Sequence, residues 1–276
     1  MKTLLDRMRE ARSLLFAPGH RPDRFEKAAA SRADGIVLDL EDSVGPGEKP
    51  CARKNIERWL SSGGIGAVRI NGVGTQWFEE DLAMVAEFPL AVLVPKADPE
   101  ATREVFGRLA PGSCVLPIVE TARGILEARS VCAQPGVVRA IFGNVDLAKE
   151  LGIDLADLSA LSAARSQLVL ASAAAGVTAP LDGVTVVLDD DEKLRSDSVH
   201  ASLLGYRGKI CLHPRQIDIV HAAFAPAEAE LQWARNVVDA AGNGSITKLD
   251  GQMIGKPIVD RARELLARSA ISYGQA

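Results

Sequence analysis

Charged and hydrogen-bonding side chains follow most of the short apolar runs in this sequence, at the carboxyl-terminal end of each run. The set is Asp39, Glu41, Asp42, Arg69, Asn71, Lys96, Glu120, Asn144, Asp146, Asp182 and His213. Helix capping explains an Asp or Asn at such a position. It does not explain Arg69 and Lys96, whose charges need carboxylate partners or an anionic ligand if they face inward. One shared polar site accounts for both signs of charge.

Glu120 and Asp146 are the residues of this set best suited to hold a divalent metal. Hard cations prefer carboxylate oxygens, and Mg²⁺ takes one or two protein carboxylates together with water and substrate oxygens. The chain has four histidines and neither an HxH nor an HExxH pattern, so zinc is the weaker alternative. We therefore predict a Mg²⁺ site at Glu120 and Asp146.

Arg69 suits the recognition of a small keto acid beside that metal. Its planar guanidinium can bind a substrate carboxylate in two places, while the metal polarises a neighbouring carbonyl and stabilises an enolate as it forms. Glu120 is expected to contact the substrate as well. Arg12, just before the first apolar run, is a second candidate for the same anion or for a thioester-linked carrier, with a solvated surface position as the alternative. Lys96 is in principle a Schiff-base nucleophile.

The elements that must position these residues are eight short runs rich in aliphatic and β-branched residues. They span residues 13–17, 35–40, 67–70, 91–95, 114–119, 137–142, 177–181 and 208–212. Stretches with helical spacing lie between them, and the runs are nearly all apolar, which is typical of a parallel sheet covered on both faces. We expect an α/β fold, a (β/α)₈ TIM barrel with a C-terminal helical extension, in which the polar strand ends meet at one mouth. An open doubly wound sheet is the alternative, although no GxGxxG follows the first run.

Length and charge limit the organisation and the partners of the chain. Its 276 residues, 47% of them hydrophobic, allow one large core. We expect a catalytic barrel over residues 1–220 and a helical extension over 221–276, packed as a lid on the barrel or on a neighbouring subunit. The net charge of −4 favours neither nucleic acid nor a membrane surface as partner. The first residues lack the apolar stretch of a signal peptide, so we expect a cytoplasmic protein.

Eight motifs occur in an order that is highly specific. They are RSLLFAPG at 12–19, VLDLEDSV at 37–44, VRIN at 68–71, VPK at 94–96, PIVET at 117–121, FGNVDL at 142–147, LGYRGK at 204–209 and HPRQ at 213–216. With these motifs the chain resembles, nearly end to end, the citrate lyase beta subunit and its HpcH/HpaI-type aldolase relatives, which include malyl-CoA lyases.

The resemblance implies a barrel that assembles into homotrimers or homohexamers, with Mg²⁺ on Glu120 and Asp146 and a substrate carboxylate or carbonyl on Arg69. Relatives make or break a carbon–carbon bond between a keto acid (oxaloacetate, glyoxylate or pyruvate) and an acyl thioester carried on coenzyme A or on an acyl carrier protein. We therefore expect a Mg²⁺-dependent carbon–carbon lyase.

One late position departs from the family pattern. Family members with thioester chemistry usually carry an Asp that acts as acid or base in some of them, and here Gly255 stands in its place within DGQMIGKP at 250–257. Either Asp42 or Asp182 substitutes, with Asp42 and Arg69 as the expected catalytic residues, or the reaction differs. The alternatives are a non-catalytic or regulatory keto-acid-binding homologue, and a thioester hydrolase or aldolase with altered chemistry. Asp250 is expected to be a turn residue.

Overall fold

The computed structural model of the protein describes residues 3–241, 247–249 and 252–273. The chain divides into two compact units, Met1–Phe224 and Ala225–Ala276. None of the described helices combines the length and the apolar character needed to cross a lipid bilayer. Asp250 lies outside the described residues, so the turn expected there is not described.

The first unit is built on eight parallel strands. They are β1 (Ser13–Pro18), β2 (Gly35–Asp39), β3 (Ala67–Arg69), β4 (Ala91–Val94), β5 (Cys114–Val119), β6 (Arg139–Phe142), β7 (Thr178–Leu181) and β8 (Lys209–Cys211). Each strand pairs with the next from β1 to β7, and β8 pairs with β1. A bridge joins Asp182 to Lys209, where the Asp182 N–H donates to the Gly208 carbonyl at 2.8 Å. The sheet thereby closes, which confirms the predicted TIM barrel and its eight strands.

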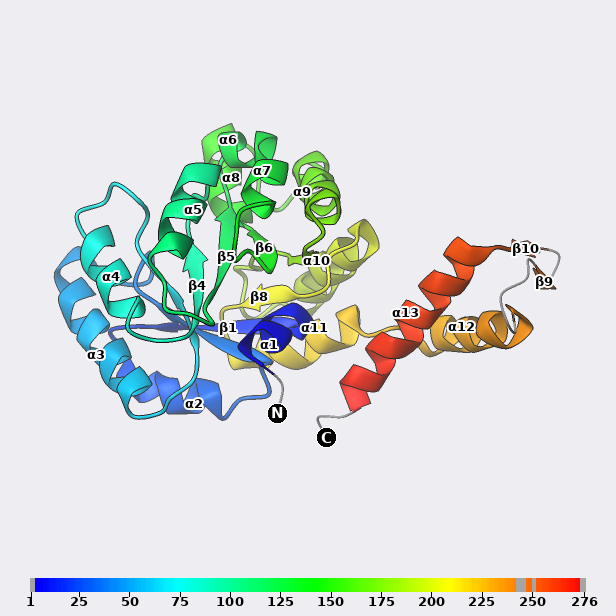
Figure 1. Ribbon diagram of the computed structural model, residues 1–276, viewed down its shortest axis with the longest axis horizontal. Coiled ribbons are helices and arrows are strands. Elements are labelled where there is room, and N and C mark those ends of the chain that lie inside the picture. Colours follow the sequence, from blue (N-terminus) through cyan, green and yellow to red (C-terminus); the bar gives the residue numbers. More distant parts are fainter. Residues whose placement is uncertain (1–2, 242–246, 250–251, 274–276) are drawn as a thin grey trace. The chain divides into compact units, whose positions relative to one another are not determined.

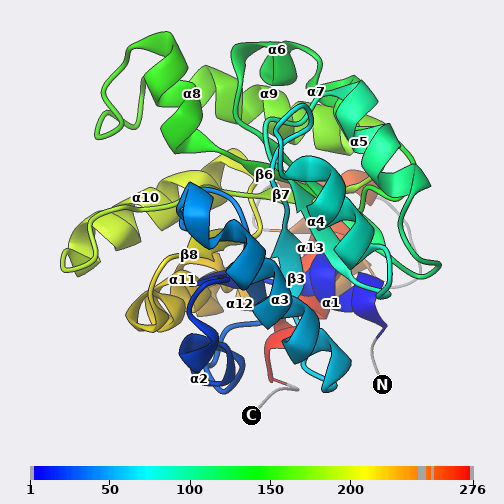
Figure 2. The ribbon, with the colours of Figure 1, turned by 90° about the vertical axis from the view of Figure 1, so that its left-hand side faces the viewer.

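Helices surround the strands, as Figures 1 and 2 show from two directions. The helices of this unit are α1 (Leu4–Glu10), α2 (Phe25–Ala29), α3 (Lys49–Ser61), α4 (Phe78–Val85), α5 (Pro99–Gly107), α6 (Ala122–Leu126), α7 (Ala128–Cys132), α8 (Asn144–Leu151), α9 (Ser162–Ala175), α10 (Asp191–Leu204) and α11 (Ile217–Phe224), with short 3₁₀ turns η1 (Pro22–Arg24), η2 (Pro46–Glu48) and η3 (Pro214–Gln216).

Strand β4 shows why the runs are apolar throughout. All four of its residues are buried. Ala91 and Leu93 belong to the cluster that fills the barrel interior, whereas Val92 and Val94 belong to the cluster between strands and helices. Because successive side chains of a strand point to opposite faces and both faces are covered here, no position of the run is left for a polar residue.

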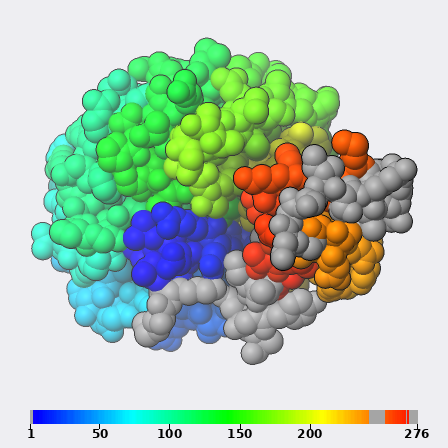
Figure 3. All heavy atoms as spheres, turned by 45° about the vertical axis from the view of Figure 1, so that its right-hand side comes forward, coloured from blue at the N-terminus to red at the C-terminus, as the bar shows by residue number. Residues whose placement is uncertain are grey.

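Helix α1 closes the amino-terminal end of the barrel. Arg139, fully buried at the start of β6, donates from Nη1 to the carbonyls of Ala11 (2.5 Å) and Met8 (3.3 Å). Met8 lies in the last turn of α1 and Ala11 directly follows the helix. Backbone carbonyls at these positions have no hydrogen-bond partner within the helix, so Arg139 supplies one. The outer side of α1 lies on the molecular surface (dark blue in Figure 3).

The second unit has a small core of its own. Helices α12 (Glu228–Ala241) and α13 (Lys256–Tyr273) pack against each other, and β9 (Thr247–Leu249) and β10 (Gln252–Ile254) form an antiparallel pair. The buried residues are Ala234, Val237, Ala241, Ile254, Val259, Ala262 and Leu265. Gly255 precedes α13 and its carbonyl accepts the Ile258 N–H at 3.0 Å, so this position starts the helix.

Candidate active site at the barrel mouth

A cavity of about 400 Å³ opens at the carboxyl-terminal ends of the strands. The structure brings four of the predicted site residues to it: Arg69, Asp42, Glu120 and Asp146. Its remaining lining is Phe16, Pro18, Arg24, Asp39, Ser43, Ile118, Ile141, Phe142, Gly143, Asn144, Val145, Gly183, Val184, Ile210 and Leu212. The lining therefore combines apolar residues of the barrel interior with charged residues at the strand ends.

Glu120 follows β5 directly and is buried, with 5% of its surface exposed. Its Oε1 accepts the main-chain N–H of Lys96 at 2.7 Å. A Cβ at position 143 would lie 2.2 Å from Glu120 Cβ and 2.5 Å from Oε2, so the side chain has its place because residue 143 is glycine. Burial, and then the negative charge of Glu41, raise the pKa of Glu120 to about 8. A bound cation would offset the cost of ionising this buried carboxyl and would lower its pKa.

Asp146 lies in the first turn of α8, which begins directly after Gly143. Its side chain is 31% exposed, and its charge is among those that raise the pKa of Glu120. The neighbouring Asn144 is already used, because its amide exchanges hydrogen bonds of 2.9 Å with the backbone of Val184. Asp146 and Glu120 line the same cavity, and of its four carboxylates they are the two that are not paired with Arg69.

This donor set fits Mg²⁺. It offers two carboxylates, and within the described residues no group of three or more His, Cys, Asp or Glu side chains has a geometry that could hold a metal. A structural zinc site needs about four protein ligands, whereas Mg²⁺ keeps several waters and takes oxygen atoms from its substrate. Glu120 and Asp146 could therefore hold Mg²⁺ with the cavity supplying room for the remaining ligands.

Arg69 ends β3 and is held by three carboxylates. Its Nε and Nη2 donate to the two oxygens of Asp39 at 2.6 and 2.8 Å. Its Nη1 lies 2.8 Å from Glu41 Oε2 and 3.1 Å from Asp42 Oδ2. Burial raises the pKa of Asp39, but the charge of Arg69 outweighs it and holds that pKa below its ordinary value.

In this structure Asp39, and not an open space for a substrate carboxylate, lies at the planar fork of Arg69 Nε and Nη2. Asp39 is fully buried and occupies that fork, because a buried carboxylate needs a compensating cation. The Nη1 edge remains, where Asp42 is 63% exposed and can move away from Arg69.

Lys96 does not have the properties of a Schiff-base lysine. Its Nζ lies 3.3 Å from Glu41 Oε1 and 3.8 Å from Asp146 Oδ2. Burial lowers the pKa of Lys96, but these carboxylates outweigh it and raise the pKa above its ordinary value. A nucleophilic lysine needs a lowered pKa, so this alternative is not supported.

Two other predicted residues lie away from the cavity. Arg12 precedes β1, whose carboxyl-terminal Pro18 reaches the cavity, so Arg12 lies at the opposite end of the barrel, where its Nε is 3.7 Å from Asp34. Asp182 is 1% exposed and paired with Arg165 at 2.9 Å and Lys209 at 2.8 Å. Neither residue lines this cavity, so the structure gives no support to substrate binding by Arg12 or proton transfer by Asp182 there.

Two further polar residues, His213 and Arg24, lie near the carboxyl-terminal ends of the strands. His213 caps η3, and its Nδ1 accepts the Arg215 N–H at 3.2 Å. This hydrogen bond gives His213 a structural role, and the residue does not line the cavity. Arg24 also lines the cavity, from η1; its place in the sequence gives no signal of this, since it lies several residues beyond the end of β1.

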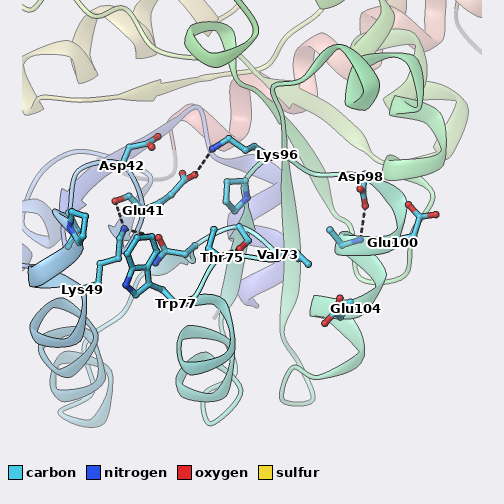
Figure 4. A pocket seen from close by; sticks show the side chains of 16 residues that line it. Glu41, Asp42, Lys49, Val73, Thr75, Trp77, Lys96, Asp98, Glu100 and Glu104 are labelled. Carbon is cyan, nitrogen blue, oxygen red and sulfur yellow. Dashed lines mark hydrogen bonds and ion pairs between the residues drawn. The ribbon is translucent and has the colours of Figure 1, made fainter. Parts of the chain in front are cut away.

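A second cavity, of about 530 Å³, adjoins the first and shares Asp42 with it. Figure 4 shows Glu41 and Lys96 on its wall, with the ion pair between them, and the acidic residues of the α5 region on the other side. The Nζ of Lys49 lies 4.7 Å from the ring centre of Trp77 and donates to the Leu40 carbonyl at 2.8 Å. The charged wall formed by Glu41, Lys96 and Arg69 thus separates two open spaces.

The sequence model of the HpcH/HpaI aldolase/citrate lyase family matches residues 12–214. The chain belongs to this family. The match covers every barrel strand and all six charged residues that line the cavity at the mouth.

Named relatives agree with the family and differ in activity. A citrate lyase subunit beta-like protein of Deinococcus radiodurans is 37% identical over 279 residues, which cover 94% of this chain and 97% of that protein. A (3S)-malyl-CoA thioesterase of Cereibacter sphaeroides is 34% identical over 270 residues, 94% of each chain. The crystal structure of CitE from Mycobacterium tuberculosis in complex with magnesium, acetoacetate and coenzyme A superposes with a TM-score of 0.82 at 33% identity and covers 95% of this chain and 99% of that one. The resemblance predicted from the motifs is confirmed.

Proposed function

We propose that this family member is a Mg²⁺-dependent carbon–carbon lyase that cleaves or forms a bond between a small keto acid and an acyl thioester. The observation that carries the proposal is the pairing of buried Glu120 with Asp146 beside Arg69, at the mouth of a barrel. The CitE complex with magnesium, acetoacetate and coenzyme A supports it, because it combines a metal, a keto acid and the thioester carrier in one relative.

Glu120 and Asp146 would hold the metal, which when bound supplies Lewis-acid polarisation of a substrate oxygen. Arg69 then donates from its Nη1 edge to an oxygen of the keto-acid portion, and Asp42 moves from that edge toward the substrate hydroxyl. Phe16 and Ile118 line the apolar side of the cavity and keep water from the reacting carbon atoms. Arg69 is held by Asp39 and does not need to reorient as charge develops.

Asp42 is the residue we propose for proton transfer. Asp182 is buried in its own ion pairs and Gly255 carries no acidic group, whereas Asp42 is exposed at the mouth, 3.1 Å from Arg69. In the cleavage direction Asp42 accepts the hydroxyl proton, the carbon–carbon bond breaks with formation of the keto carbonyl, and the electron pair leaves on the acyl thioester, which then takes up a proton.

Thioester hydrolysis is a second candidate. It is favoured by the 34% identity to a (3S)-malyl-CoA thioesterase. The two reactions differ in products: cleavage yields a keto acid and an acyl-CoA, whereas hydrolysis yields a hydroxy acid and free coenzyme A.

The test is titration calorimetry of oxaloacetate, glyoxylate and pyruvate into protein with Mg²⁺, with chelator, and into Glu120→Ala. Glu87→Ala, at an exposed glutamate beyond α4, is the matched control. We expect binding of a keto acid only with Mg²⁺ in wild type and control, followed by acyl-CoA turnover with keto acid as product. Keto-acid binding that is unchanged by the chelator or by Glu120→Ala would contradict the proposed metal site. Binding with release of free coenzyme A would decide for hydrolysis.

A further inference from the structure

Lys96 has a backbone conformation that lysine rarely adopts. Within the described part of the chain it is the one residue other than glycine with a positive φ, at 48°. This left-handed region is disfavoured for residues with a Cβ and is normally given to Gly, Asn or Asp. Strain of this kind persists where the surroundings fix it, and it clusters at functional sites.

The left-handed turn directs the main chain of Lys96 at a metal carboxylate. Strand β4 ends at Val94, and after Pro95 the N–H of Lys96 donates to Glu120 Oε1 at 2.7 Å. The next residue, Ala97, returns to the sheet pattern and donates to the Ile118 carbonyl at 3.0 Å. The turn thus fixes one oxygen of Glu120 and leaves Oε2 on the side of Gly143.

The side chain of the same residue reaches the other carboxylate. Its Nζ lies 3.3 Å from Glu41 Oε1 and 3.8 Å from Asp146 Oδ2, and Glu41 is itself buried and held by Arg69 at 2.8 Å. Figure 4 shows the Lys96 side chain extended toward Glu41. One residue therefore contacts Glu120 through its amide and Asp146 through its ammonium group, which no other strand-end residue at this mouth does among the described contacts.

We propose that Lys96 is a positioning residue that presets Glu120 and Asp146 for the divalent metal. This inference rests on the proposed function of that carboxylate pair. The amide fixes the orientation of Glu120, and the ammonium group, which pairs with buried Glu41, keeps Asp146 turned toward the same point. Groups that orient metal ligands in this way commonly change metal affinity by 10–100-fold when they are removed.

The ammonium group of Lys96 could affect Mg²⁺ binding in two opposite ways, through its charge or through its contact with Asp146. If the ammonium group only repelled an incoming cation, its removal would tighten Mg²⁺ binding, because the site would gain one negative charge. If it positions Asp146, its removal weakens Mg²⁺ binding in spite of that charge.

The experiment is calorimetric titration of Mg²⁺ alone into wild type, Lys96→Met, Lys96→Arg and Lys96→Gly. Lys149→Met is the matched control, because Lys149 is exposed on α8, the helix that carries Asp146, and loses the same charge. We expect Lys96→Met to bind Mg²⁺ at least about tenfold more weakly. Lys96→Arg should restore most of the affinity, and Lys149→Met should stay within about twofold of wild type.

Lys96→Gly separates positioning from general damage to the fold. Glycine keeps the N–H for Glu120 and relieves the positive φ, so this variant should melt at a higher temperature than Lys96→Ala. It should nevertheless bind Mg²⁺ more weakly than wild type, because it lacks the ammonium group. Unchanged or tighter Mg²⁺ binding by Lys96→Met and Lys96→Gly, with wild type binding normally, would overturn the proposal for Lys96 alone. Failure of wild type to bind Mg²⁺ would instead overturn the proposed metal site and this inference with it.

Discussion

Two buried carboxylates of the barrel, Glu120 and Asp182, differ in what surrounds them. Asp182 has two cationic partners, Arg165 and Lys209, which outweigh its burial and hold its pKa below the ordinary value. Glu120 has one amide and carboxylate neighbours, and its pKa is raised to about 8. A buried carboxylate with cationic partners stabilises the fold. A buried carboxylate without such a partner, next to a cavity, is typical of a ligand site.

Glu120→Gln should separate metal binding from stability. Gln keeps the shape of Glu120 and can accept the Lys96 N–H, but it has no charge for a cation. We expect Mg²⁺ affinity to fall by at least about 100-fold. The metal-free variant should be no less stable than wild type at pH 8, because it lacks a carboxyl that burial makes costly to ionise. Calorimetry and thermal melting check the two parts, and a large loss of metal-free stability would contradict the account.

Asp182→Asn should destabilise the protein by about 3–5 kcal/mol at neutral pH, because it leaves Arg165 and Lys209 buried without their counter-charge. The folded-state pKa of Asp182 is lowered from 3.8, so its stabilisation is present above that value and is lost as the pH falls through the folded pKa. The difference in unfolding free energy between wild type and Asp182→Asn should therefore shrink below about pH 4. Denaturant unfolding at pH 7, 5 and 3 measures it; a difference that stays constant to pH 3 would argue against this assignment.

At the scale of elements, the strands were predictable because burial on both faces requires runs in which nearly every residue is apolar. Every predicted apolar run is a strand, and the polar ends of β2, β3, β5 and the β6–α8 turn meet at one mouth. Strand direction alone also places Arg12, since a residue that precedes a parallel strand lies at the other end of the barrel.

Pairing between strand ends was not predictable from the order of the sequence. Asp39 and Arg69 lie 30 residues apart, and which face of the guanidinium the carboxylate takes depends on the stagger of β2 against β3. Asp182 and Lys209 meet only because the barrel closes between β7 and β8. The positive φ of Lys96 has no signal in its residue type, because lysine does not favour that conformation.

The turn from β6 into α8 makes a further prediction at this scale. Gly143→Ala would put a Cβ 2.2 Å from Glu120 Cβ, so the carboxylate must shift. We expect Mg²⁺ affinity to fall by at least about tenfold and stability by about 1–3 kcal/mol. Gly107→Ala, at the exposed end of α5 with open space around it, is the control and should gain about 0.5–1 kcal/mol. Calorimetry and denaturant unfolding of both variants measure the effects; normal Mg²⁺ binding by Gly143→Ala would contradict the proposed position of Glu120.

At the scale of the whole molecule, all proposed metal and substrate residues belong to the first unit, and the second unit has a separate core. We propose that a chain ending at Phe224 folds cooperatively and keeps its Mg²⁺ affinity within about threefold, because no ligand is removed. Circular dichroism melting and calorimetry check this. A folded short chain that no longer binds Mg²⁺ would show that residues 225–276 complete the site. Assembly into trimers or hexamers stays a prediction, to be checked by light scattering of both chains.

The central claim is that Glu120 and Asp146 hold the metal. Its most direct test is anomalous diffraction from crystals of the full chain grown with Mn²⁺, which takes the same oxygen ligands as Mg²⁺. We expect one strong anomalous peak in contact with the carboxylates of Glu120 and Asp146, and its loss in Glu120→Gln. A peak at other carboxylates, such as those of the α5 region, with none between Glu120 and Asp146, would contradict it.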